Sequence, residues 1–418
     1  MPDDGKPLTS LVANRLPWHS LDAAFYTDPA IFETDLDVIF GRHWIYVGVE
    51  PDVPEPGDCM VVDIGRNSIL IVRDDDEGVR AFHNVCRHRG AKLVQEPKTS
   101  VGNIVCPYHQ WTYGVDGTLR FAEHMAADFD RSCHGLKPIH LKSVAGLLFI
   151  CLSDNPPDDI DDMAAALTPY LAPHDLPNAK VVKQIDLIEL GNWKLTMENN
   201  RECYHCASSH PELTVSLFEY GFGFDPNSGT EARRELAARY QALVGQCHID
   251  WEKNGLPSRE IDHLDDRPTG YRTERLPLDG TGESQTLNTA RASTKLLGNL
   301  TDAKLGGLSM WTQPNSWHHF MADHIVTFSV IPLEPERTLL RTKWLVHKDA
   351  VEGVDYNINN ITAVWEATNK QDGDLVAMAQ AGARTSGYEP GPYSPFTEGL
   401  VEKFSAWYIS RLKAHQEP

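Results

Sequence analysis

Short hydrophobic runs separated by turn residues dominate the chain from residue 44 to about residue 153. The clearest of these runs span residues 59–62, 68–72 and 146–150. Runs of this length, rich in Val, Ile and Leu and bounded by Gly, Asp and Asn, are typical of β-strands. The pattern predicts a small all-β domain, followed by a Pro- and Asp-rich linker at residues 154–159.

Helical and strand patterns are mixed in the rest of the chain. Hydrophobic residues at helical spacing predict a helix over residues 30–40, within an N-terminal extension that covers residues 1–43. Strands are expected at residues 181–190, 324–332 and 338–347, and helices at residues 192–206 and 354–378. The polar segment 249–300 is expected to be a long surface excursion, either a lid or a poorly ordered loop. The chain is thus divided into residues 1–43, 44–155 and 160–418.

Composition and charge narrow the range of partners. The 418 residues include 38 Lys and Arg against 59 Asp and Glu, a formal net charge of −21. Such a charge argues against nucleic acid or an anionic membrane as the main partner. No apolar run reaches the ~18 residues of a membrane span, and the N-terminus lacks a signal-peptide pattern. The cysteines lack the spacing of a disulfide framework, which predicts reduced thiols in a cytoplasmic protein.

Two cysteine–histidine pairs give the strongest chemical signal. They are Cys86-x-His88 and Cys106-x-x-His109, each in a strand-and-turn context. Two thiolates on one iron and two neutral imidazoles on the other form the ligand set of a Rieske [2Fe–2S] cluster, with a potential of roughly −150 to +300 mV. A Cys2His2 zinc site uses the same residue types, but the flanks favour the cluster. The chain is therefore predicted to carry electrons one at a time.

A second metal site is suggested by the dense run of ionisable groups from Glu198 to His210. His205 and His210 are five residues apart, which places them ~140° apart on an ideal helix. The helix must therefore end or bulge between them, and Pro211 supplies a stop. Two converging histidines and a distant carboxylate would form the facial triad of an Fe(II) site that leaves positions open for O2. The carboxylate is expected to be Asp372, with Asp374 as the alternative.

Taken together, these motifs resemble the catalytic α subunit of Rieske non-haem iron oxygenases over nearly the whole chain. Further markers are Asn192-Trp193-Lys194, Glu198-Asn199, and Gln380 eight residues after Asp372. The resemblance implies an α+β fold, with an all-β Rieske [2Fe–2S] domain at residues 44–155 and a catalytic domain at residues 160–418. That domain would hold an antiparallel sheet flanked by helices in a helix-grip or START-like arrangement, and the extension would belong to it. The expected cofactors are one [2Fe–2S] cluster and one mononuclear Fe(II) per subunit.

Glu202 narrows the substrate class within that resemblance. In the family a carboxylate three residues before the first iron histidine bridges the two metal sites across a subunit boundary, which implies a homotrimer. The carboxylate is usually Asp, whereas Glu resembles the subgroup that oxidises quaternary ammonium compounds, especially the glycine betaine and stachydrine (proline betaine) demethylases. The expected reaction is hydroxylation of an N-methyl group with release of formaldehyde. Alternatives are aromatic-ring hydroxylation, aryl-ether O-demethylation, or an electron carrier or zinc protein without catalysis.

Recognition of a cationic head group favours an electron-rich aromatic site, because ring faces attract cations by ~0.5–2 kcal/mol each. Trp311, Trp317 and His319 are candidates for this site, although core packing is the commoner role of such residues. Cys203 and Cys206, which flank His205, are expected to be small packing residues. No G-x-G-x-x-G nucleotide motif occurs, so electrons are expected from a separate NAD(P)H-dependent reductase that carries flavin and iron–sulfur groups.

Overall fold

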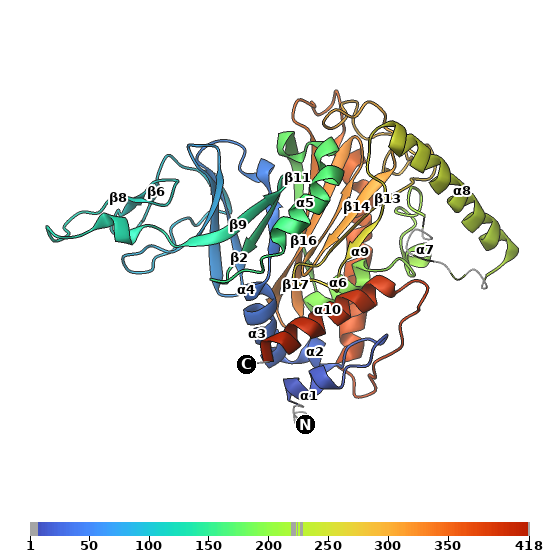
Figure 1. Ribbon diagram of the computed structural model, residues 1–418, viewed down its shortest axis with the longest axis horizontal. Coiled ribbons are helices and arrows are strands. Elements are labelled where there is room, and N and C mark those ends of the chain that lie inside the picture. Colours follow the sequence, from blue (N-terminus) through green and yellow to red (C-terminus); the bar gives the residue numbers. More distant parts are fainter. Residues whose placement is uncertain (1–6, 219–222, 224, 226–228, 417–418) are drawn as a thin grey trace.

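Two large antiparallel sheets organise the chain in the computed structural model, which describes residues 7–218, 223, 225 and 229–416 (Figure 1). The first sheet has the order β1-β10-β9-β4-β3-β2-β5. Its strands are β1 (Ile45–Val49), β2 (Asp58–Ile64), β3 (Asn67–Arg73), β4 (Val79–His83), β5 (Lys98–Ser100), β9 (Pro138–Val144) and β10 (Leu147–Cys151). A small sheet extends from it and consists of β6 (Ile104–Val105), β7 (Thr112–Tyr113) and β8 (Leu119–Phe121).

The second large sheet has the order β11-β17-β16-β15-β14-β13-β12. Its strands are β11 (Ala179–Glu189), β12 (Ile261–His263), β13 (Tyr271–Leu276), β14 (Gly307–Thr312), β15 (Ser316–Phe320), β16 (His324–Glu334) and β17 (Arg337–His347). The helices α5 (Ile160–Leu171), α6 (Trp193–Asn200), α7 (Cys206–Ser209), α8 (Glu231–Lys253), α9 (Ile358–Ala383) and α10 (Gly399–Gln416) surround this sheet.

The second sheet is covered on both faces, so almost every residue of its central strands β14, β15 and β16 is buried. On one face Trp317 and Phe328 pack in the same core as Val364 and Trp365 of α9. On the other face the sheet packs in a separate core that includes α5. The arrangement of a long helix on an antiparallel sheet confirms the predicted fold class.

The N-terminal segment packs on the helices of the second sheet, and its last helix also contacts β10 of the first sheet. Its helical elements are α1 (Leu8–Ala13), α2 (Ala24–Thr27), α3 (Pro29–Thr34), a π-helical turn (Asp35–Ile39) and α4 (Phe40–Arg42). Asp35 is fully buried and pairs with Lys194, while Tyr408 donates to its other oxygen at 2.6 Å. Trp193 Nε1 also donates to Asp35, at 2.9 Å. The Asn192-Trp193-Lys194 motif therefore anchors α6, because a buried charge is tolerated only when it is paired and hydrogen-bonded.

Short 3-10 turns complete the structure, at Glu50–Asp52, Arg131–His134, Ala172–His174 and Leu176–Asn178. The first six residues of the predicted extension lie outside the described residues. Among the residues that the structure describes, no helix combines the length and the apolar character that a membrane crossing requires.

Several predicted elements need correction. Segment 249–300 is not one surface excursion, since it contains the end of α8 and the strands β12 and β13 of the second sheet. Every residue of Tyr271–Leu276 is buried. Burial of Arg272 is possible because it pairs with Glu274 and Glu260. In the sequence these charged residues resemble a surface loop, so the strand was not predicted. The predicted helix 192–206 ends at Asn200. The predicted helix 354–378 runs instead from Ile358 to Ala383.

Candidate metal centres

The first cysteine–histidine pair lies on a tight loop after β4. The amide of Cys86 donates to the carbonyl of Ala91 at 2.8 Å, and the amide of Gly90 donates to the carbonyl of Cys86 at 3.0 Å. The turn requires a left-handed residue, and Gly90 supplies it with φ +76°.

The second pair lies on a loop of the same design between β6 and β7. Here the amide of Cys106 donates to the carbonyl of Trp111 at 2.8 Å, and the amide of Gln110 donates back to Cys106 at 3.1 Å. Gln110 takes the left-handed position, with φ +58°. The two loops thus present their ligands in equivalent ways, which is the paired arrangement expected from the sequence.

The two cysteines of the loops lie deeper in the protein than the two histidines. Cys86 and Cys106 are buried, at 3% and 1% exposure, whereas His88 is exposed. The rings of His88 and His109 lie 4.6 Å apart at the outer end. The hydroxyl of Tyr113 lies 3.3 Å from Cys86 Sγ. Two buried thiols beneath two outward imidazoles fit a [2Fe–2S] cluster whose histidine-bound iron faces the surface.

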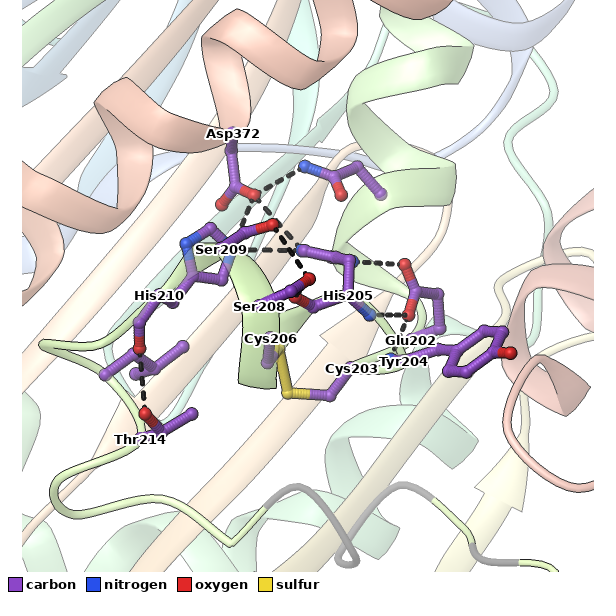
Figure 2. Close-up of a disulfide and its surroundings, with 12 residues drawn as sticks. Glu202, Cys203, Tyr204, His205, Cys206, Ser208, Ser209, His210, Thr214 and Asp372 are labelled. Atoms are coloured by element: carbon purple, nitrogen blue, oxygen red, sulfur yellow. Dashed lines mark hydrogen bonds and ion pairs between the residues drawn. A yellow bond between two sulfur atoms is a disulfide. The ribbon is translucent and has the colours of Figure 1, made fainter.

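The second centre begins where α6 ends. After Asn200 the chain turns through Arg201–His205, and the single-turn helix α7 follows. His205 is the residue before α7 and His210 is the residue after it. The predicted break between the two histidines is therefore present, and it takes the form of a short separate helix that directs both rings towards α9 (Figure 2).

His205, His210 and Asp372 converge on one point (Figure 2). The two Nε2 atoms lie 3.0 Å apart, and they lie 3.3 Å and 3.0 Å from Asp372 Oδ1. Three ligands held at right angles about 2.1 Å from one ion would be about 3.0 Å apart. The triangle therefore has the size of one metal-binding face. The alternative residue, Asp374, is exposed and makes no contact with either histidine within the described part of the chain.

Each imidazole is held through its other nitrogen. Glu202 Oε1 accepts from Nδ1 of His205, and Gln371 Oε1 lies 2.8 Å from Nδ1 of His210. Both rings therefore keep Nε2 free for a metal, which is the usual function of such outer contacts. The amide of Asn199 donates to Asp372 Oδ1 at 2.7 Å. Sequence reasoning found Glu202 but missed Gln371, for which adjacency to Asp372 was the available signal.

The electrostatics of the triad favour a bound cation. Burial lowers the pKa of His205, but Asp372 and Glu202 outweigh burial and raise it to about 9. Burial raises the pKa of Asp372, but His205 and His210 outweigh it and lower the pKa below its ordinary value. In the metal-free state the site thus retains a proton that a metal ion would displace.

Cys203 and Cys206 form a disulfide beside the triad, so the prediction that they are reduced packing residues is wrong (Figure 2). The turn before α7 brings their Cα atoms to 4.9 Å, within the usual range for a disulfide. Ligand atoms of His205, Cys206 and His210 all lie within 4.8 Å of one another. A disulfide sulfur is not a thiolate, however, so Asp372 is the third ligand available to a metal. The other six cysteines form no disulfide, which agrees with the prediction of reduced thiols for the four that are not expected to bind the cluster.

The three predicted substrate residues lie on one face of the second sheet. Trp317 stacks on Phe328 with ring centroids 4.9 Å apart, and His319 stacks on Trp365 at 4.7 Å. Trp311 shares this face but already has the guanidinium of Arg272 at 5.6 Å from its ring.

The aromatic set therefore includes two members that the sequence did not single out, Phe328 of β16 and Trp365 of α9. Burial lowers the pKa of His319 to about 3, so its ring is neutral. Trp365 precedes Asp372 by two helical turns, about 10.5 Å along the axis of α9 and on the same face. Trp365 of the aromatic set and Asp372 of the triad thus lie on the same side of α9.

Two family models match the chain in the same order as the two centres. The Rieske [2Fe-2S] domain matches residues 43–142, and the ring hydroxylating alpha subunit (catalytic domain) matches residues 176–414. Both centres therefore lie within the matched ranges.

Similar proteins cover nearly the whole chain. The glycine betaine monooxygenase oxygenase subunit of Chromohalobacter salexigens is 45% identical over 95% of this chain and 87% of its own length. The corresponding subunit of Pseudomonas aeruginosa is 42% identical over 97% of this chain and 92% of its own length. The quaternary ammonium Rieske monooxygenase CntA in complex with L-carnitine superposes with a TM-score of 0.69 and 20% identity, over 97% of this chain and 99% of that chain.

The family matches, the near-complete overlap with curated relatives and the two sets of converging ligands agree with one another. The chain belongs to the Rieske non-haem iron oxygenases, as the α subunit that contains both a Rieske [2Fe–2S] cluster and a mononuclear iron.

Proposed function

We propose that this oxygenase removes a methyl group from a small quaternary ammonium compound, glycine betaine or proline betaine. The observation that carries the proposal is the similarity of 42–45% to two glycine betaine monooxygenase oxygenase subunits over almost the whole chain. The glutamate at position 202, in the outer contact with His205, supports the same subgroup.

We assign the metal ligands from the geometry of the two centres. Cys86, His88, Cys106 and His109 hold the [2Fe–2S] cluster, and His205, His210 and Asp372 hold the mononuclear iron. The 3.0–3.3 Å triangle of ligand atoms supports the second set.

The extension at residues 1–43 functions as part of the catalytic domain at residues 160–418, and residues 44–155 form the Rieske domain. The buried pair of Asp35 and Lys194 supports this division.

The reaction consumes one O2 and two electrons per methyl group. One oxygen atom enters the N-methyl carbon, and the other leaves as water with two protons. The resulting N-hydroxymethyl ammonium breaks its C–N bond to give formaldehyde and the demethylated amine. The iron supplies the activation of O2. Glu202, through its hydrogen bond to Nδ1 of His205, fixes that ring and takes part in electron entry as the catalytic carboxylate.

The aromatic set Trp317, His319, Phe328 and Trp365 is the proposed site of the cationic head group. Ring faces would attract it by ~0.5–2 kcal/mol each, and the neutral state of His319 avoids repulsion. Trp311 is the weaker candidate because its ring already faces Arg272. Loss of betaine binding in Trp317→Ala, with recovery in Trp317→Phe, is the expected result, and unchanged binding in Trp317→Ala removes that residue from the site.

Electrons pass between subunits in this proposal. The small sheet with β6 and β8, next to the second cluster loop, lies at one end of the long axis, whereas α7 lies on the far side of the second sheet (Figure 1), so a neighbouring copy offers the shorter route. The cluster loops expose Tyr108, at 55%, with the guanidinium of Arg89 4.9 Å from its ring, and Arg87 is exposed on the same loop as Arg89. Beside His205 a cavity of about 300 Å³ is lined by the carboxylates Glu202 and Glu398 among other residues. This complementarity of charge supports a homotrimer, with electrons supplied by a separate NAD(P)H-dependent reductase.

The test of the reaction is formaldehyde release with glycine betaine, proline betaine and carnitine, under O2 and with reductase or dithionite as the electron source. Equal amounts of formaldehyde and demethylated amine are expected from one of the betaines. Product from an aromatic acid, with no formaldehyde from any betaine, would overturn the proposal.

The test of assembly mixes two inactive variants. Cys106→Ser lacks the cluster, and His210→Ala lacks an iron ligand. Dissociation and reassociation of the mixture is expected to restore part of the activity, because a mixed trimer pairs an intact cluster with an intact iron site. No recovery, in mixtures shown to exchange subunits, contradicts electron transfer between subunits.

A further inference from the structure

The two imidazoles of the iron triad are held by different chemistry. His205 faces the carboxylate of Glu202, whereas His210 faces the amide of Gln371. A carboxylate only accepts at neutral pH, so it defines the proton on His205 without further help. An amide presents an oxygen on one side and an NH2 group on the other, so Gln371 defines the proton on His210 only if its own orientation is fixed.

Glu212 fixes that orientation. The Nε2 of Gln371 donates to Oε2 of Glu212 at 2.9 Å. The carboxylate has no proton to give, so it pairs only with the NH2 end of the amide and turns the carbonyl towards His210. The carbonyl in turn accepts from Nδ1, which leaves Nε2 of His210, 3.0 Å from Asp372 Oδ1, as the nitrogen available to a metal.

The placement of Gln371 adds to this effect. It precedes Asp372 in α9, so one turn of helix delivers both a ligand and the group that orients another ligand. Glu212 lies two residues beyond His210, on the segment that leaves α7. The contact of Gln371 with Glu212 therefore also ties the histidine segment to α9.

We propose that Glu212, Gln371 and His210 form a relay in which the surface carboxylate sets the amide and the amide sets the metal-binding tautomer of His210. Gln371 and Glu212 are positioning residues in this relay, and neither contacts the metal. The inference rests on the proposed role of His210 as an iron ligand. It deepens that role, because it makes iron affinity depend on a residue of the protein surface.

The first test is Fe(II) affinity of the mononuclear site in Gln371→Leu and Gln371→Glu, measured by competition with a chelator. Leu removes the acceptor and is expected to weaken iron binding about 10–100-fold, the usual effect of losing such a contact. Glu restores an acceptor for Nδ1 and is expected to stay within a few-fold of the wild type. Absorbance of the distant [2Fe–2S] cluster reports in the same samples that each variant is folded.

The second test separates orientation from charge at position 212. Glu212→Gln and Glu212→Met both remove the negative charge, but only Gln keeps an acceptor for the amide of Gln371. A several-fold loss of iron affinity and an altered EPR spectrum of the ferrous nitrosyl adduct are expected in Glu212→Met, and a smaller change in Glu212→Gln, because Gln keeps an acceptor for Gln371 but no longer excludes the flipped amide. Equal behaviour of the two variants, or wild-type affinity in Gln371→Leu, overturns the relay.

His210→Ala distinguishes the relay from the assignment on which it rests. If His210→Ala abolishes iron binding while Gln371→Leu has no effect, the relay alone fails. If His210→Ala itself binds iron normally, the ligand assignment in the proposed function fails. Glu366→Gln, at an exposed glutamate of α9 away from the triad, is the control for loss of a surface charge and is expected to bind iron as the wild type.

Discussion

Lys343 of the second sheet and Asp52 of the segment after β1 form a buried ion pair that joins the two large sheets. Their side chains are 3% and 0% exposed. The other oxygen of Asp52 accepts from Lys98 of β5 at 2.7 Å, and its first oxygen also accepts from the amide of Val49 at 2.9 Å. The Asp52 carboxylate thus binds one strand of each sheet. It thereby helps to fix the position of the two metal-binding regions relative to each other.

Removal of Lys343 is expected to cost more stability than removal of Lys98. Lys343→Met leaves Asp52 buried beside one half-exposed lysine, and breaking a buried pair in this way costs about 3–5 kcal/mol. Lys98 is 44% exposed, so Lys98→Met is expected to cost about 1 kcal/mol or less. Urea denaturation of the two variants measures the difference, and equal losses would contradict a buried role for Lys343.

The cluster loops could be predicted from the sequence because each is a local motif. Within each loop the two ligands are at most three residues apart, and the turn depends on neighbouring residues such as Gly90. Asp372 is distant in the chain from His210, and the expected facial triad directed the choice to a carboxylate that the structure places beside both histidines. The orientation of Gln371 depends on contacts between α9 and the segment after α7, so no local pattern revealed it.

The errors have a common physical cause. In strand β13 Arg272 pairs with Glu274 of the same strand and with Glu260 just before β12, and a single sequence contains no such pairing information. The disulfide of Cys203 and Cys206 depends on a turn that interrupts the predicted helix 192–206. Periodicity therefore predicted individual strands and helices, the family resemblance implied the layers, and side-chain pairing across the fold decided the details.

Glu202→Gln is expected to separate iron binding from electron entry. The substitution keeps the size of the side chain but removes the charge that Nδ1 of His205 contacts. Iron content should fall by less than tenfold, while the rate of formaldehyde formation in a single turnover falls about 10–100-fold. Glu366→Gln is the control for loss of a negative charge, because Glu366 is exposed on α9 away from the triad. Equal rates in the two variants would remove Glu202 from electron entry.

Because Cys203 and Cys206 form a disulfide, the number of cysteines that an alkylating agent modifies should depend on prior reduction. Alkylation after unfolding without reductant is expected to modify six cysteines, and alkylation after reduction to modify all eight. Closing so short a loop contributes about 2 kcal/mol in the chain-entropy model, so the double Cys203→Ser, Cys206→Ser variant should lose about that much stability. Cys133→Ser, at an exposed free thiol, should lose none. Mass spectrometry that finds eight modified cysteines without reductant would exclude the disulfide.

Glu189, a buried carboxyl close to the iron triad, is expected to make the free energy of unfolding depend on pH. It ends β11, is 2% exposed, and accepts from the hydroxyl of Thr196, while its Oε1 has no hydrogen-bond partner among the described residues. Burial, with a further contribution from the charge of Asp372, raises its pKa to about 7 from an ordinary value of 4.5. Between these two pH values the folded state keeps a proton that the unfolded state has lost. Folding is therefore progressively disfavoured as the pH rises through this window, and the cost is constant above it.

Glu189→Gln has no such proton, so its stability relative to the wild type should rise by about 3 kcal/mol between pH 4.5 and pH 7 and then level off. The comparison is made by urea denaturation after chelation of the mononuclear iron, because bound iron would offset the charge of Asp372. The Thr196 hydroxyl lowers the pKa of Glu189, so Thr196→Val should move the upper end of the window to higher pH. A stability difference between Glu189→Gln and the wild type that is independent of pH would show that Glu189 is already ionised in the folded protein at pH 4.5.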